Sequence, residues 1–164
     1  MTLVKIVTIL ALISVSTLSP ACSGSANKTL NSSDPASSNK ANANTIKSDV
    51  EELGLLVTVP YAAEDVVWKE YPSQKRLVAV LRFSTEDTAK LVADAEKYRQ
   101  PEAVTISSET WFPTELVAQG EITGEDTLNG RSYAATKFLQ EPYTSGRLVR
   151  IDNTDFFVLD VAAK

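Results

Sequence analysis

The composition of the chain changes at about residue 49, and this change limits where a folded core can form. Residues 23–48 are rich in Ser, Asn and Ala, with only Leu30 and Ile46 as large apolar side chains. Such a segment cannot bury enough apolar surface to offset the entropy of ordering its backbone. We therefore expect residues 22–48 to be a disordered tether and residues 49–164 to form one domain, large enough for a single core without disulfides.

Residues 1–21 have the pattern of an export signal. Lys5 precedes an apolar stretch at residues 6–15, which is too short to span a bilayer because a spanning helix takes about 20 apolar residues. Cys22, the only cysteine of the chain, follows directly after this segment. The arrangement resembles a bacterial lipoprotein signal, in which the cysteine becomes the first mature residue and receives acyl chains. The resemblance implies lipidation at Cys22 and a membrane-anchored protein of the cell envelope, facing the periplasm or the exterior.

Two positions before Cys22 differ from the usual lipoprotein signal. Leu18 lies four residues before the cysteine instead of three, and Pro20 stands where a small residue is usual. Ser19 and Ala21 also satisfy the small-x-small rule of ordinary secretory cleavage, so simple secretion with a free Cys22 is the alternative, and an uncleaved anchor is a third possibility. If two or more acyl chains are attached, at about 0.8 kcal/mol per buried methylene, they hold a protein stably in its membrane.

The charge of the folding part excludes one class of partner. Residues 49–164 contain 12 Lys and Arg against 20 Asp and Glu, a net charge of −8, and the whole chain has −5. Because phosphate backbones bind to basic surfaces, nucleic acid is not expected as a partner. The expected partners are the membrane, through the lipid anchor, and another envelope protein.

Alternation of apolar and polar residues predicts two antiparallel hairpins. The first joins residues 66–71 to 77–83, and the second joins residues 148–151 to 156–161 through a turn rich in Asp and Asn. Trp68 and Phe83 lie at alternating positions that predict core packing. A further short strand is expected at residues 55–59, where Pro60 ends it.

Two helices are expected between the hairpins. Ser84 is a predicted N-cap, with Leu91 and Ala95 on the apolar face of the helix and Pro101 after its end. A shorter helix begins at Pro113 and runs toward Gly120. Residues 121–146 have weak periodicity and are expected to form long loops with at most one strand. Together the patterns predict an α+β domain with a largely antiparallel sheet of two hairpins packed on one main helix.

A sparse set of positions across residues 55–161 resembles a pattern found in uncharacterised bacterial envelope proteins. The resemblance covers most of the expected domain but implies no activity and no functional residue. The positions are Pro60, Ala63, Val66 and Trp68, then residues 80–83, residues 111–113 and residues 150–152.

Catalytic machinery is not evident in the sequence. The chain has no histidine, which removes Ser-His-Asp and Cys-His nucleophile systems and the commonest zinc ligand. The adjacent acidic pairs do not converge by spacing, and the Asp- and Asn-containing segments 124–130 and 152–155 fit turns better than calcium loops. No catalytic residue, cofactor or metal is expected. The alternative is a secreted or periplasmic enzyme that acts on envelope glycan through two carboxyl groups about 5 to 9.5 Å apart.

Aromatic residues are the candidates for recognition. Trp111 and Phe112 lie where a loop enters the second helix, and Tyr143 lies in the irregular stretch. Aromatic side chains on loops often contact protein partners or ligands, although the same residues can fill the core beneath a long connection. The expected function is a non-catalytic binding or structural module tethered by acylated Cys22.

Replacing the cysteine tests the anchor. We expect the full-length protein to fractionate with membranes and to show acyl mass, and we expect Cys22→Ser to lose both because the acylated thiol is gone. Ser23→Ala is the matched control and should behave as wild type. Intact mass spectrometry of the fractionated protein is the measurement. A soluble, unacylated wild type that begins at Cys22 would support simple secretion instead.

Overall fold

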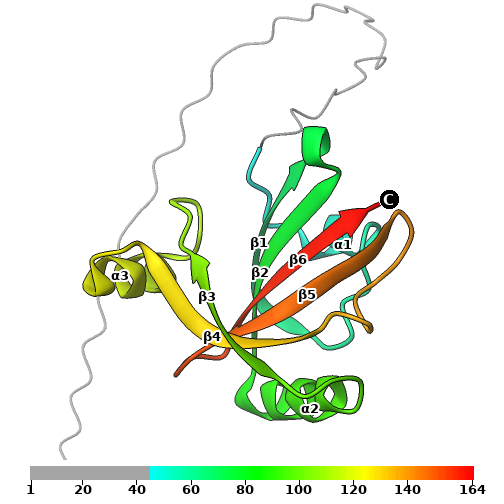
Figure 1. Cartoon of the computed structure of the whole chain (residues 1–164). Coiled ribbons are helices and arrows are strands. Elements are labelled where there is room, and N and C mark those ends of the chain that lie inside the picture. The colour runs from blue at the N-terminus through cyan, green and yellow to red at the C-terminus, as the bar shows by residue number, and fades with distance from the viewer. Residues whose placement is uncertain (1–44) are drawn as a thin grey trace, which may run out of the picture. The chain divides into compact units, whose positions relative to one another are not determined.

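A computed structural model describes residues 45–164, which form a six-stranded sheet with three α-helices (Figure 1). The strand order is β1-β2-β6-β5-β4-β3, and every neighbouring pair is antiparallel. The expected α+β class with an antiparallel sheet is confirmed. The signal segment, Cys22 and most of the expected tether lie outside the described residues. Within residues 45–164 no helix is long and apolar enough to cross a bilayer.

The strand pairs predicted at residues 66–83 and 148–161 are present and supply four of the six strands, so the expected sheet of two hairpins packed on one main helix is replaced by a larger sheet with three helices. The two pairs are β1 with β2 and β5 with β6. The remaining two strands, β3 and β4, pair with each other, and β4 pairs with β5. The elements in chain order are α1 (Val50–Gly54), β1 (Ala63–Tyr71), the 3-10 turn η1 (Pro72–Gln74), β2 (Arg76–Phe83), α2 (Thr85–Glu96), β3 (Glu102–Ser107), α3 (Thr114–Thr123), β4 (Thr127–Ala134), β5 (Tyr143–Ile151) and β6 (Phe156–Ala163).

Strand β2 is buried on both faces, which explains why the domain has two cores. Its odd-numbered residues, such as Leu81, pack with α1 and α2, while Val78 and Val80 pack with residues from α3 and the segment before it. Trp68 and Phe83 lie in the first core with 0% and 1% exposure, so their predicted burial is confirmed. The helices therefore cover opposite faces of one sheet.

The helix predicted after Ser84 is α2, and its predicted cap is confirmed. The Ser84 hydroxyl accepts a hydrogen bond from the Asp87 backbone N–H at 3.1 Å. Near the end of this helix Asp94 accepts hydrogen bonds from Tyr61, Lys97 and Lys137. Hydrogen bonding from Lys137, followed by Lys97 and Tyr61, lowers the pKa of Asp94 well below its ordinary value. This carboxylate joins α2 to the two loops that flank it.

Two sequence expectations require correction, and one residue of the expected tether has a place in the fold. Residues 55–59 form no strand, because α1 precedes them with Asp49 as its N-cap and the chain turns at once to bury Val57. Residues 121–146, expected to form long loops with at most one strand, contain the whole of β4 and the start of β5. Lys47, at the end of the expected tether, exchanges two backbone hydrogen bonds with Trp68. The helix predicted at Pro113 is confirmed, with Pro113 as the N-cap of α3 and Gly124 as its left-handed C-cap.

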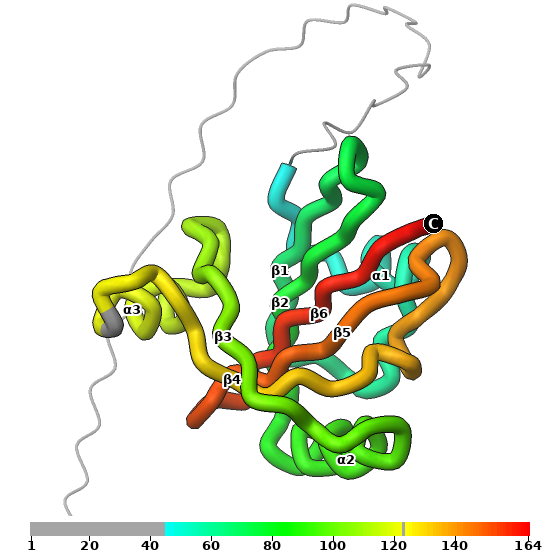
Figure 2. Tube along the Cα trace, viewed as in Figure 1, coloured from blue at the N-terminus to red at the C-terminus, as the bar shows by residue number. Residues whose placement is uncertain are grey.

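The sheet curls so that β3 lies across from the central strands, as the ribbon and tube both show (Figures 1 and 2). Glycine permits the close approach of β5 to β6. Gly146 has a φ of 155°, and a Cβ atom at this position would lie 2.3 Å from the carbonyl oxygen of Asp160. No side chain fits there, so a glycine at residue 146 is required by the register of β5 on β6.

A pair of alanine substitutions tests this requirement. We expect Gly146→Ala to lower the free energy of unfolding by about 3 kcal/mol, because the new methyl group overlaps backbone and the φ value is strained. The control is Gly54→Ala, where a Cβ meets nothing within 4 Å in helix α1. That variant should be unchanged or more stable by up to about 1 kcal/mol. Chemical denaturation measures both, and equal stabilities would contradict the close approach.

Candidate functional site

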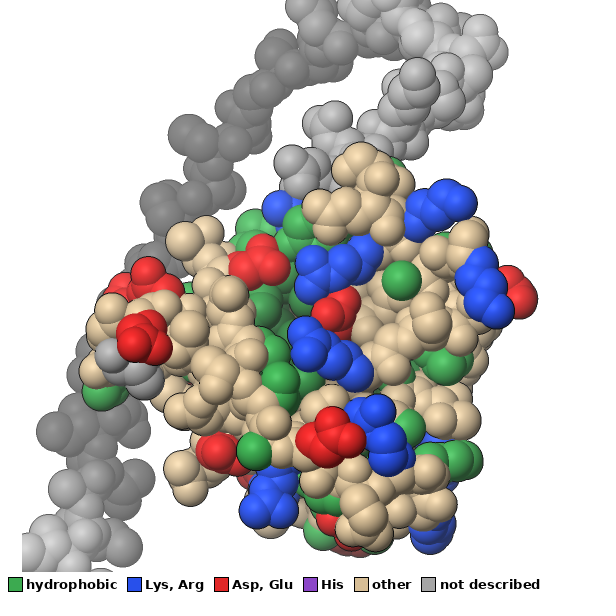
Figure 3. All heavy atoms as spheres, in the orientation of Figure 1, with side chains coloured by type: hydrophobic (Ala, Val, Ile, Leu, Met, Phe, Trp, Pro, Cys, Tyr) green, Lys and Arg blue, Asp and Glu red, His purple; other side chains and the backbone are tan. Residues whose placement is uncertain are grey.

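The concave face of the curled sheet holds a groove between β3 and the central strands. Two adjoining hollows of about 500 Å³ and 340 Å³ lie along it and share Arg147 and Asp160. Strand β3 borders both hollows, with β6 and β2 on the other side, although β4 and β5 separate β3 from β6 in the sheet. Figure 3 shows apolar side chains beside a band of basic and acidic ones on this face. Volumes of this size are typical of ligand sites.

Asp160 organises the charges of the groove. Its Oδ1 accepts a hydrogen bond from Arg76 Nε at 2.6 Å, and its Oδ2 lies 3.5 Å from Arg147. Hydrogen bonding to Asp160 raises the pKa of Arg76 above its ordinary value, even though burial opposes this. Both guanidinium groups are therefore held in place by one carboxylate, while most of the N–H donors of Arg147 are left for other acceptors.

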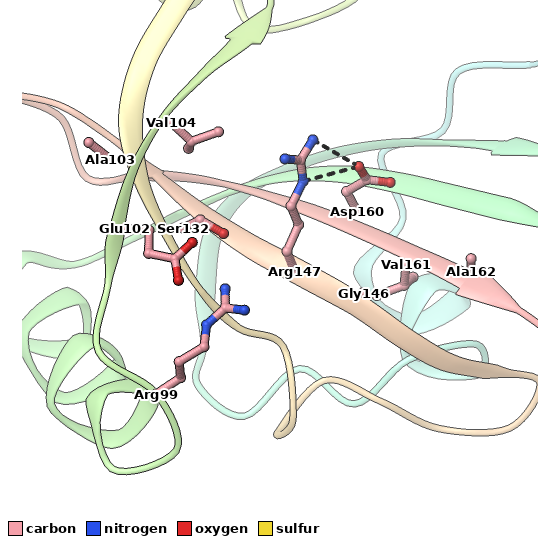
Figure 4. Close-up of a pocket in the computed structure, with 10 residues that line it drawn as sticks. All are labelled: Arg99, Glu102, Ala103, Val104, Ser132, Gly146, Arg147, Asp160, Val161 and Ala162. Atoms are coloured by element: carbon pink, nitrogen blue, oxygen red, sulfur yellow. Dashed lines mark hydrogen bonds and ion pairs between the residues drawn. The ribbon is translucent and has the colours of Figure 1, made fainter.

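Arg99 adds a second cation to the larger hollow. Figure 4 shows its side chain directed toward Glu102 and Ser132, and no hydrogen bond or ion pair joins Arg99 to the other residues drawn. Arg147 lies on the far side of the same hollow, directed toward Asp160. The hollow thus contains two arginines and the carboxylates of Glu102 and Asp160. Both arginines have N–H donors that can bind an acidic group of a ligand.

Glu109 borders the smaller hollow and links it to Tyr71 of β1. Glu109 accepts hydrogen bonds from the Tyr71 hydroxyl at 2.7 Å and from Trp111 Nε1 at 2.6 Å. Arg76 lies over the Tyr71 ring, 5.5 Å from its centroid. Burial, followed by the hydrogen bond to Glu109, raises the pKa of Tyr71 to about 12. These contacts join β1 to the segment after β3 beside the smaller hollow.

The structure brings together two of the three aromatic residues proposed as partner contacts. Phe112 is 6% exposed and lines the smaller hollow, and Trp111 packs on it edge to face with ring centroids 4.8 Å apart. Tyr143 is buried in the core on the other face of the sheet, with α1 and α2. Tyr143 therefore does not share a surface with Trp111 and Phe112. A contact role for these residues stays a prediction.

Arg76, Arg147 and Asp160 were missed by sequence reasoning. One signal was present: Asp160 interrupts the apolar run of β6, where a charge on a doubly buried strand needs a partner. Its partner Arg76 lies 84 residues away, and no local pattern indicates the pairing. Among residues 45–164, no group of three or more Cys, Asp or Glu side chains is placed to hold a metal ion.

Comparison with known proteins gives no match to a family model, to a curated protein or to a solved structure. The function must therefore be inferred from the groove and from the sequence.

The buried hydrogen bond between Tyr71 and Glu109 predicts how the stability of the fold changes in alkaline solution. Because the pKa of Tyr71 is raised from 10.0 to about 12 on folding, its contribution to stability is complete below pH 10 and is lost as the pH rises toward 12. Tyr71→Phe should lose less stability over this range than wild type. Tyr98→Phe, at a tyrosine that is 53% exposed, is the control and should follow wild type. Denaturant unfolding across this pH range is the measurement, and coincident curves for Tyr71→Phe and wild type would contradict the buried contact.

Proposed function

We propose that this protein is an envelope lipoprotein, held in its membrane by acylated Cys22, whose domain binds a ligand or partner protein in the concave groove without catalysis. The observation that supports the proposal most directly is the groove itself, where Arg76 and Arg147 are fixed by one carboxylate beside apolar side chains. Preorganised charges on rigid strands suit recognition, since little order is lost when a ligand binds.

Binding is favoured over catalysis by the way the groove carboxylates are engaged. Both oxygens of Asp160 contact arginine donors, and one oxygen of Glu109 accepts from both Tyr71 and Trp111. A general base needs a lone pair directed at its substrate, and a nucleophile needs an activating partner. The absence of histidine from the chain agrees with this interpretation.

The glycan enzyme is kept as the second candidate because Glu102 and Asp160 border the same hollow. A two-carboxylate hydrolase would need both groups at the reacting bond. Turnover of envelope glycan by the purified protein, lost in Glu102→Gln and in Asp160→Asn, would support this candidate. Turnover unchanged in both variants would exclude the groove as its active site.

A charge substitution in the groove tests the binding proposal in native membranes. We expect Arg147→Gln to lose crosslinked partners that the full-length wild type retains, because the free guanidinium donors of Arg147 are removed. The matched control is Arg131→Gln, an exposed arginine on β4 that does not border either hollow. Thermal unfolding of each variant verifies that the fold is intact. Equal recovery of partners by Arg147→Gln and Arg131→Gln would count against the groove as the binding site.

A further inference from the structure

The two edges of the sheet differ in how they are protected from other strands. At the β1 edge, Lys47 exchanges backbone hydrogen bonds of 2.9 and 2.8 Å with Trp68, which occupies the outward groups of that residue. The register of β1 shifts between Ala63 and Asp65, and the strand contains four charged residues. Bulges, charges and covering segments are the devices by which proteins prevent pairing at an edge.

The β3 edge has almost none of these devices. Its six residues, EAVTIS, contain one charge at the first position and no proline, and its register on β4 has no shift. β3 ends the strand order of the sheet, so among residues 45–164 no strand pairs with its second edge. In an antiparallel pair every second residue directs its N–H and C=O away from the partner strand. A row of backbone donors and acceptors is therefore available along β3.

The open edge of β3 lies at the groove. Residues 102–104 border the larger hollow and residues 105–107 border the smaller one, so the strand has open space along its whole length. A third hollow of about 390 Å³ lies against residues 103–105, with Asn129, Gly130 and Asp152 as its other lining residues. A paired strand would lie about 4.8 Å from β3. Arg147 and Asp160 border both of the hollows that β3 borders, so a strand paired with β3 beside these hollows would come close to their side chains.

We propose that the groove takes an extended peptide segment of a partner protein, which pairs with β3 as an added strand and places a carboxylate on Arg147 and Arg99. The inference rests on the proposed function and names the class of ligand. Main-chain hydrogen bonds to β3 supply the affinity, as in other cases of strand addition. Alternate side chains of the peptide face the half-buried Val104 and Ile106, which favours small apolar residues at those positions.

A peptide fits the site better than a second copy of this chain. The free donors of Arg147 and Arg99 call for an acidic group, and β3 itself offers only Glu102 at its first position. The folding part of the chain has a net charge of −8, so two copies repel each other. Pairing of β3 with β3 of a copy is an outcome that the test can detect.

The test uses the full chain in detergent and a fluorescent peptide of alternating threonine and valine that ends in aspartate and is as long as β3. We expect the peptide to bind and to slow hydrogen exchange of alternate β3 amides, measured by NMR, without slowing exchange in β1. A version with N-methyl groups on alternate amides is the matched control and should not bind, since its donors are removed. Binding that leaves the β3 amides unprotected would overturn the proposal.

Substitutions separate the carboxylate contact from the backbone contact. Arg147→Gln should weaken peptide binding about tenfold, the effect of losing a charge-assisted hydrogen bond. Replacing the terminal aspartate of the peptide by asparagine should weaken binding to wild type by a similar factor and have little further effect in Arg147→Gln. Arg131→Gln should bind as wild type. Equal affinity of the peptide for wild type and Arg147→Gln would contradict the proposed contact between the peptide carboxylate and Arg147.

The outcomes distinguish this inference from the proposed function. If the peptide fails to bind in the millimolar range while membrane partners still depend on Arg147, the ligand is not an added strand and the binding groove stands. If neither peptide binding nor the recovery of membrane partners depends on Arg147, the groove is not the binding site. A different result would be concentration-dependent dimers whose β3 amides are protected without peptide. That result would show that β3 pairs with a second copy of the chain.

Discussion

The pairing of β2 with β6 is the interaction on which the rest of the structure depends. Both strands lie inside the sheet, between β1 and β5, and both are buried on both faces, with Ala79 opposite Leu159 and Val80 opposite Val158. One set of alternate residues packs under α1 and α2, and the other set packs toward α3. Each core therefore requires the same two strands in one register. A shift of one residue would move each set into the other core, where its side chains do not fit the existing packing.

The groove arises where the apolar pattern of these central strands ends. Arg76 lies at the start of β2 and Asp160 lies near the end of β6, and these two strand ends are neighbours because the strands are antiparallel. Arg147 of β5 lies opposite Asp160 in register. Backbone hydrogen bonds of the sheet fix all three positions, so the charged contacts need no loop to hold them. The curl of the sheet then brings β3 across from them. An open strand edge and a fixed set of charges thus meet on one concave face.

Local patterns predicted much of the fold. Alternation predicted β1 with β2 and β5 with β6, and the Ser84 cap predicted α2, because these signals depend on residues close in sequence. β3 and β4 were missed since their sequences read as irregular: β3 is short and half exposed, and β4 contains Asn129 and Gly130, which are typical of turns. Gly130 is nonetheless within the strand, because its missing side chain lets β4 approach the carbonyl of Arg150.

The sequence by itself determined the acidic charge of the domain, the absence of histidine, the single cysteine at Cys22 and the elements built from local hydrogen bonds and alternation. Only the tertiary structure decided the strand order, the curl of the sheet and the meeting of Arg76 with Asp160 across 84 residues of chain. The physical reason is the separation along the sequence over which each interaction acts. Caps and alternation act between neighbours in sequence, whereas the groove depends on contacts that form only when both cores have packed on β2 and β6.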